Sequence, residues 1–178
     1  VVASGTYLAP PTPYDPDRLR GGFYPTFNSP SFHCHAADVE VDPDTGAVRV
    51  RKIVVVQDVG FAINPLYVEG QMQGGSAQAL GYALTEELHF EDGRVLNPNL
   101  ALYKLPTTLE VPEIEPIILE YPSAEGPHGA KGVGEPPVIV TAGAIANAVY
   151  DATGVQLRRT PLTPERIYRA LRGVEDGA

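Results

Sequence analysis

A single acidic residue, Glu135, follows a run of closely spaced glycines and precedes two prolines. Glycine lets the backbone approach a ligand closely, and proline favours the first turn of a helix. We therefore expect the carboxylate at a helix N-terminus, where negative charge is favoured. A carboxylate held rigidly in a closed site can take a proton as a general base. The alternative, which the spacing alone leaves open, is that Glu135 only caps its helix.

A second group of glycines falls inside a helix that we predict over residues 66–84. Asn64 can cap this helix, and Pro65 suits its first turn. Each glycine inside a helix costs roughly 1 kcal/mol relative to alanine, so four of them need a reason. We expect that reason to be another group that comes close to the backbone. The four glycines are Gly70, Gly74, Gly75 and Gly81.

The run His33, Cys34 and His35 suggests a metal-binding cluster at first sight. In a strand, residues 33 and 35 share one face and residue 34 takes the other. No fourth ligand has suitable spacing, so we expect no metal ligand in this chain. Cys34 is expected to be a small buried side chain, and the role of the three residues stays open. One cysteine also excludes an iron–sulfur cluster held by this chain alone, which needs about four thiolates.

The elements around these residues predict an α+β fold, with β-hairpins and a mixed sheet packed against about three helices. Alternating apolar and polar residues with a Pro-Asp-Thr-Gly turn indicate a hairpin. Proline and glycine at the expected boundaries indicate helix starts and ends. The expected elements are a hairpin over 35–58, a short hairpin at 87–90 and 94–96, a strand at 115–121, and helices at 136–153 and 164–171.

The first 32 residues differ in composition from the rest of the chain. They are rich in proline, glycine and aromatic residues without a steady period. So many aromatic side chains are unusual for an indifferent linker. We therefore predict an extended arm over 1–32 that lies along another surface, followed by a folded subdomain over 33–178.

Composition and charge limit the kinds of partner. The net charge of −9 argues against nucleic acid, because phosphate recognition needs clustered Lys and Arg. No apolar run approaches the ~20 residues of a membrane span, and no signal peptide is visible. A single cysteine fits a reducing compartment. We expect a cytoplasmic protein, with the periplasm left open.

Three runs of residues resemble the molybdenum hydroxylases of the xanthine dehydrogenase and aldehyde oxidase family. Lys131–Pro137, KGVGEPP, resembles the active-site loop. Asp58–Pro65, DVGFAINP, followed by Glu69–Gly75, EGQMQGG, resembles the helix entry that contacts the cofactor. Ala144–Asp151 and the later PLTPER run resemble the closing helices. The matches lie in the family's order, so the chain is identified as the C-terminal part of a molybdopterin-binding subunit.

The resemblance implies roles for individual residues. Glu135 is implied to be the general base that activates a water-derived oxygen for attack on an electron-poor carbon of an aldehyde or N-heterocycle. Lys131 either meets a cofactor phosphate or pairs with a nearby carboxylate, and we favour the second. The pterin holds the molybdenum through sulfur, so the chain need supply no metal ligand. The implied cofactor-binding residues are Gln71, Gly74, Gly75, Gly132, Val133 and Gly134.

The resemblance also implies what lies outside this chain. The family's molybdopterin-binding subunit is several times longer, so its remainder is an expected partner, and iron–sulfur clusters and FAD belong to partner domains or subunits. The chain alone should be inactive and should expose an apolar patch where the remainder docks. Two other interpretations stay open. One is a non-catalytic assembly or scaffold domain of the same fold, and the other is a fragment of a carbon monoxide dehydrogenase-like enzyme.

Overall fold

The structure is a computed structural model that describes residues 2–6 and 29–174. Most of the arm predicted for residues 1–32 therefore lies outside the described residues. The division into an arm and a subdomain stays a prediction.

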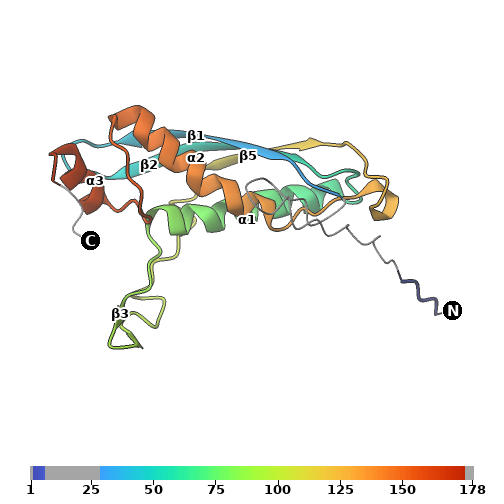
Figure 1. The fold of residues 1–178 in the computed structure, drawn as a ribbon, viewed down its shortest axis with the longest axis horizontal. Coiled ribbons are helices and arrows are strands. Elements are labelled where there is room, and N and C mark those ends of the chain that lie inside the picture. The colour runs from blue at the N-terminus through green and yellow to red at the C-terminus, as the bar shows by residue number, and fades with distance from the viewer. Residues whose placement is uncertain (1, 7–28, 175–178) are drawn as a thin grey trace, which may run out of the picture.

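A three-stranded mixed sheet forms one layer of the molecule (Figure 1). The strands β1 (His33–Val41) and β2 (Val48–Asp58) pair antiparallel, which confirms the predicted hairpin. The strand β5 (Glu113–Leu119) pairs with β2 in parallel and begins two residues before the predicted strand. Its Pro116 is tolerated because β5 is an edge strand, where one side of the backbone needs no ladder hydrogen bonds.

Two long helices, α1 (Pro65–Leu84) and α2 (Pro136–Thr153), pack against this sheet and against each other. Both match the predicted helices. The side chain of Asn64 accepts a hydrogen bond from the Tyr67 backbone at 3.3 Å, as a helix cap should, and Gly154 ends α2 in the left-handed conformation. The core between the helices and the sheet contains Val50, Ile53, Val55, Met72, Leu80, Ile114, Ile145 and Val149.

Smaller elements complete the predicted α+β fold. The two-residue strands β3 (Phe90–Glu91) and β4 (Arg94–Val95) form a hairpin that projects away from the two layers (Figure 1). Positive φ at Asp92 and Gly93 fits the tight turn between them. The helix α3 (Pro164–Leu171) packs against the turn of the β1–β2 hairpin and is capped by Thr163, as predicted. Among the described residues, no helix combines the length and the apolar character needed to cross a membrane.

Candidate functional site

The glycine-rich loop before Glu135 is held by the exit of β2. The Lys131 backbone N–H donates to the Val59 carbonyl at 2.9 Å, and the Phe61 N–H donates to the Gly129 carbonyl at 3.1 Å. Gly60 lies between these two contacts with a φ of 69°, and a Cβ atom there would clash with the Gly129 carbonyl. The exit of β2 and the loop therefore fit together only because residue 60 is glycine.

A buried ion pair fixes the same loop through side chains. The Lys131 Nζ lies 2.5 Å from the Asp58 Oδ2, and the two side chains are 10% and 5% exposed. This confirms that Lys131 pairs with a nearby carboxylate. Burial works to raise the pKa of Asp58, but hydrogen bonds from Lys131 and from the Gly60 and Tyr121 backbones together hold that pKa below its usual value.

A residue that the sequence analysis did not single out contacts the next part of the loop. Gln57, fully buried near the end of β2, points its Nε2 at the Gly132 carbonyl (3.3 Å) and the Val133 carbonyl (3.5 Å). Its Oε1 is buried and has no hydrogen-bond partner among the residues that the structure describes. The available signal was a polar residue at a position that continues the alternation of the buried apolar residues Ile53 and Val55.

Glu135 occupies the N-cap position of α2, as predicted, but its side chain does not cap that helix. Its side chain is exposed and accepts no hydrogen bond from the helix N-terminus. Pro136 occupies the first helical position, where a missing N–H costs nothing. The interpretation of Glu135 as a helix cap is therefore wrong. The carboxylate stands free at the positive end of a helix dipole.

The loop and α1 meet at Gln71. The position that a Cβ atom would take on Gly134 lies 3.6 Å from the Gln71 Oε1. One turn further along α1, Gly75 lies against Pro137 at the start of α2. Residues 71–75 and the Glu135 loop, more than 50 positions apart in the sequence, are thus neighbours in the fold. The Gln71 amide is exposed and makes no hydrogen bond within the described part of the chain.

The glycines of α1 divide into two kinds. A Cβ atom on Gly75 would lie 2.8 Å from the Pro137 Cβ, and one on Gly81 would lie 2.8 Å from the Pro106 Cδ. A Cβ atom on Gly70 or Gly74 would meet nothing within 4 Å. The expectation of one shared reason was therefore too simple. Two of these glycines permit packing within the chain, and two border open space.

The glycines of the loop divide in the same way. A Cβ atom on Gly126 would clash with the Ala130 carbonyl, whereas one on Gly132 would meet nothing within 4 Å. Between Gly132 and Gly134, the side chain of Val133 packs against the core. Only the backbone of Val133 is therefore available to a ligand. Of the predicted cofactor-binding residues, those with open space beside the backbone are Gly74 and Gly132, with Gly134 next to Gln71.

His33 and His35 face the helices, and their rings meet edge to face with centroids 6.1 Å apart. The His35 Nδ1 lies 2.8 Å from the Thr141 hydroxyl, which also lies 2.9 Å from the Pro137 carbonyl and 3.2 Å from the Ser76 hydroxyl. Burial, and secondarily the charge of His33, lowers the pKa of His35 to about 4. Within the residues that the structure describes, no group of three or more His, Cys, Asp or Glu side chains could hold a metal ion.

Cys34 takes the other face of β1 and is exposed. The prediction of a buried Cys34 is wrong. The cause is strand alternation, because His33 and His35 occupy the positions that face the helices. Among the described residues, no helix covers the opposite face of β1.

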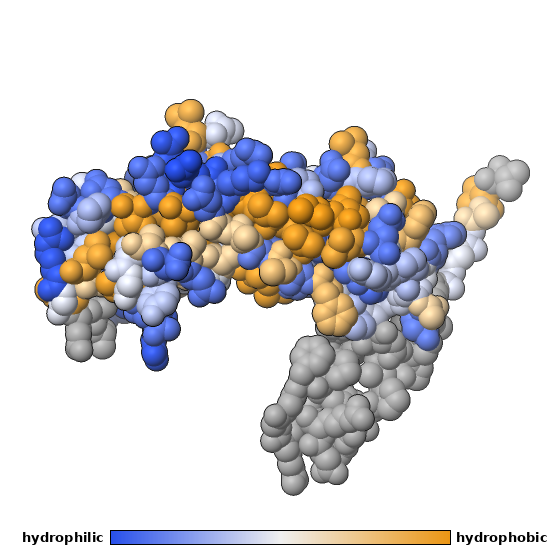
Figure 2. All heavy atoms as spheres, turned by 90° about the horizontal axis from the view of Figure 1, so that it is seen from above, coloured by the Kyte–Doolittle hydropathy of each residue, from blue (hydrophilic) through white to orange (hydrophobic). Residues whose placement is uncertain are grey.

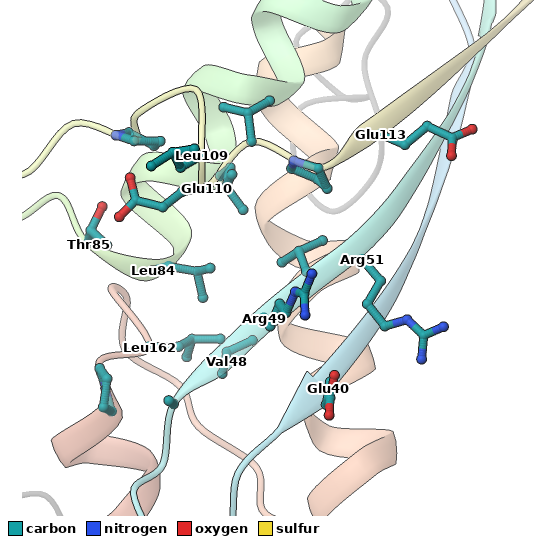
Figure 3. A pocket seen from close by; sticks show the side chains of 17 residues that line it. Glu40, Val48, Arg49, Arg51, Leu84, Thr85, Leu109, Glu110, Glu113 and Leu162 are labelled. Carbon is teal, nitrogen blue, oxygen red and sulfur yellow. The ribbon is translucent and has the colours of Figure 1, made fainter.

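A cavity of about 780 Å³ lies at the other end of α1 (Figure 3). Its walls come from the beginning of β2, the end of α1 and the segment before β5, with Arg49, Leu84 and Leu109 among the lining side chains. None of the predicted site residues lines it. The candidate site is therefore not this hollow but the exposed surface shared by the Glu135 loop and the first half of α1.

Much apolar surface is exposed as well, as predicted. Figure 2 shows hydrophobic side chains gathered in a band along one long face of the molecule. Close to the site in sequence, Phe61, Ile63 and Leu66 are 47%, 63% and 72% exposed. Ile139 on α2 is 67% exposed. Large apolar side chains exposed to this extent are typical of a surface that another protein segment covers.

Comparison with known proteins gives a consistent result. The family model described as the molybdopterin cofactor-binding domain matches residues 1–112. The chain is 43% identical over 145 residues to the xanthine dehydrogenase molybdenum-binding subunit of Escherichia coli O157:H7, covering 80% of this chain and 19% of that subunit. It is 34% identical over 154 residues to the carbon monoxide dehydrogenase large chain of Afipia carboxidovorans, covering 85% and 19%.

A solved structure agrees with these relatives. The crystal structure of quinoline 2-oxidoreductase from Pseudomonas putida 86 superposes with a TM-score of 0.74 at 43% identity, covering 79% of this chain and 18% of that one. The chain thus spans about a fifth of the length of the relatives it matches. The fold class and the molybdopterin cofactor predicted from the sequence are confirmed at the level of the family. The chain belongs to the molybdopterin cofactor-binding domain family of the xanthine dehydrogenase and aldehyde oxidase type of molybdenum hydroxylase.

Proposed function

We propose that this chain supplies the general base and part of the molybdopterin site of an enzyme that hydroxylates an aldehyde or an N-heterocycle with oxygen from water. The observation that carries the proposal is the placement of the Glu135 carboxylate and its lack of a capping contact. Its carboxylate is held at a helix N-terminus, has no partner in the cap, and lies one residue from the Gly134–Gln71 contact. An acidic group that no contact among the described residues uses is suited to take a proton from a water-derived oxygen.

The residues around Glu135 fit a flat, polar cofactor. Open space beside Gly74 and Gly132 would let such a group approach both backbones closely. Gln71 offers a free amide on the same surface, which can both donate and accept a hydrogen bond. When bound, the molybdenum-carrying pterin supplies the two-electron redox chemistry that the side chains of this chain lack.

The chain's own part in the reaction is positioning and proton transfer. Pro136 and Pro137 restrict the backbone on one side of Glu135, and the tethered loop restricts it on the other. This restriction places the Glu135 side chain on one side of the loop, where its carboxylate can reach a water-derived nucleophile bound at the site. Gln71, Gly74, Gly75 and Gly132–Gly134 form the wall of the cofactor site in this proposal.

Among substrates, an N-heterocycle is favoured over carbon monoxide. The relatives named for xanthine and quinoline are 43% identical to this chain, against 34% for the one named for carbon monoxide. Both xanthine and quinoline present an electron-poor ring carbon beside a nitrogen. A small planar substrate of that class would approach the free Glu135 carboxylate from the exposed side of the loop.

The proposed partners follow from the length of the relatives. Because the chain spans about a fifth of them, we propose that the remainder of a molybdopterin subunit covers the exposed apolar surface around Phe61, Ile63 and Leu66. Iron–sulfur and FAD groups would reside on further domains or subunits. Without that remainder the site is a one-sided surface, so the isolated chain should not turn over substrate.

The test is Glu135→Gln in the complete enzyme. Loss of the general base should lower turnover by at least ~10²-fold while the bound molybdenum stays constant. The matched control is Glu165→Gln, since Glu165 is also an exposed glutamate beside a proline at a helix start. It should turn over at the native rate. Native turnover in Glu135→Gln would instead favour a scaffold domain that retains the fold without the chemistry.

A further inference from the structure

The loop that leads into Glu135 has an unusual tether. Backbone contacts from the exit of β2 hold residues 129 and 131, and α2 begins at Pro136. Between these two supports, the Gln57 amide provides the hydrogen bonds that the Gly132–Gly134 backbone receives from the described part of the chain. The shorter of the two, 3.3 Å to the Gly132 carbonyl, is the one that carries weight.

The orientation of this amide is determined by its surroundings. Two carbonyl oxygens face one end of the Gln57 side chain, so that end must be the NH₂ group. The Oε1 end is then left buried without a partner. A buried acceptor without a partner destabilises the fold, and an apolar side chain of similar length would avoid that cost. Gln57 is fully buried, but it therefore contributes little to the stability of the fold.

We propose that Gln57 is a positioning residue, which sets the place of the Gly132–Gly134 backbone and through it the aim of the Glu135 carboxylate. This inference rests on the proposed role of Glu135 as the base. The link is short, because only Val133 and Gly134 separate Gly132 from Glu135, and both prolines that follow are fixed in α2. A displacement of about 1 Å at a reacting group can lower a rate by ~10²-fold.

The informative variant is Gln57→Met in the complete enzyme, because methionine keeps the volume and removes the donor. The Gly132 carbonyl lies in an exposed residue and can turn to water, so the fold should survive. We expect kcat to fall by roughly 10- to 100-fold, with KM and molybdenum content close to native. In the complete enzyme, where the cofactor and the remainder of the subunit cover this loop in our proposal, amide hydrogen exchange at residues 132–135 should become faster. The unfolding temperature should stay the same or rise.

A matched control is Asn97→Leu. Asn97 is likewise a buried amide that bonds loop backbone, here the Glu87 carbonyl and the His89 N–H, in another part of the molecule. This variant should lose stability while kcat and exchange at residues 132–135 stay native. The contrast separates placement of the loop from a general effect of removing a buried amide.

Two results would overturn the inference. In the first, Gln57→Met keeps both native kcat and native exchange at residues 132–135. In the second, its kcat falls only as far as the amount of folded, molybdenum-loaded enzyme falls. Glu135→Gln, measured in parallel, keeps the two proposals apart. If it turns over normally, the role of Glu135 as base fails, whereas hydrogen exchange in Gln57→Met still decides whether the amide holds the loop.

Discussion

The two sides of the Glu135 loop differ in how completely this chain fills them. On the side toward the sheet, a Cβ atom on Gly60 would clash with the loop, and the Asp58–Lys131 pair and the Gln57 amide hold the loop in place. On the side toward the first half of α1, Gly74 and Gly132 border open space, and the nearby Gln71 side chain makes no hydrogen bond with the described residues. Glycine therefore occurs on the two sides of the loop for different reasons. Glycine is needed for packing on the closed side, whereas contacts within the described residues do not require it on the open side.

The largest effect expected from this contrast comes from Gly60→Ala. Its φ of 69° disfavours any side chain, and the new Cβ atom would clash with the Gly129 carbonyl. Strain and overpacking together should destabilise the protein by on the order of 3 kcal/mol or more. Gly70→Ala, on the open side of α1, should instead raise the free energy of unfolding by about 0.5–1 kcal/mol. Denaturant unfolding of both variants measures the two changes in unfolding free energy. Changes of the same sign would contradict the distinction between the closed and the open side.

A smaller effect is expected when the buried ion pair is broken. Lys131→Met leaves the Asp58 carboxylate with only two backbone donors, at Gly60 and Tyr121. Removing one partner of a buried pair typically costs about 3–5 kcal/mol, and the remaining donors place this case at or below the lower end. The double variant with Asp58→Asn should recover part of the loss. Additive losses in the double variant would show that the two side chains do not act as a pair.

Filling the open side should affect the cofactor rather than the fold. Gly74→Val adds a side chain where nothing lies within 4 Å in this chain, so folding should be nearly unchanged. If a cofactor occupies that space, overpacking of about 1–3 kcal/mol should lower its affinity by roughly tenfold or more. Metal analysis and pterin fluorescence of the purified enzyme measure the content. Native content would mean that Gly74 does not face the cofactor.

The smallest effect on stability is expected from the buried His35 at low pH. The pKa of His35 is lowered from 6.5 to about 4, so the unfolded chain binds a proton in that window and the folded chain does not. Stability is therefore complete above about pH 6.5 and falls as the pH drops toward 4, by at most about 2 kcal/mol at pH 5.

His35→Asn should remove that part of the pH dependence in unfolding experiments. The exposed His89, replaced by Asn, is the control and should leave the slope unchanged. A native slope in His35→Asn would show that the buried imidazole does not control it.

The sequence was sufficient wherever local chemistry decides the structure. Caps and breakers such as Asn64, Pro136 and Gly154 give the helix boundaries, because each acts within one turn of its own position. The sequence also gave reason to single out Glu135, since its flanking glycines and prolines are adjacent to it.

The remaining features depend on contacts between distant segments. The parallel pairing of β2 with β5, the burial of Gln57 beneath the loop and the packing of Gly75 on Pro137 join residues more than 50 positions apart. Hydrophobic periodicity shows which face of an element is buried but not which segment covers it. The error at Cys34 has the same origin, because the residue type suggested burial while the histidines beside it faced the helices.

The most direct test of the central claim is a single-turnover measurement on the molybdenum-loaded enzyme with substrate in excess. If the carboxylate of Glu135 takes the proton, substrate should reduce the cofactor of Glu135→Gln at least ~10²-fold more slowly than that of the native enzyme. The cofactor of Glu165→Gln should be reduced at the native rate. Reduction of Glu135→Gln at the native rate per bound molybdenum would contradict the account.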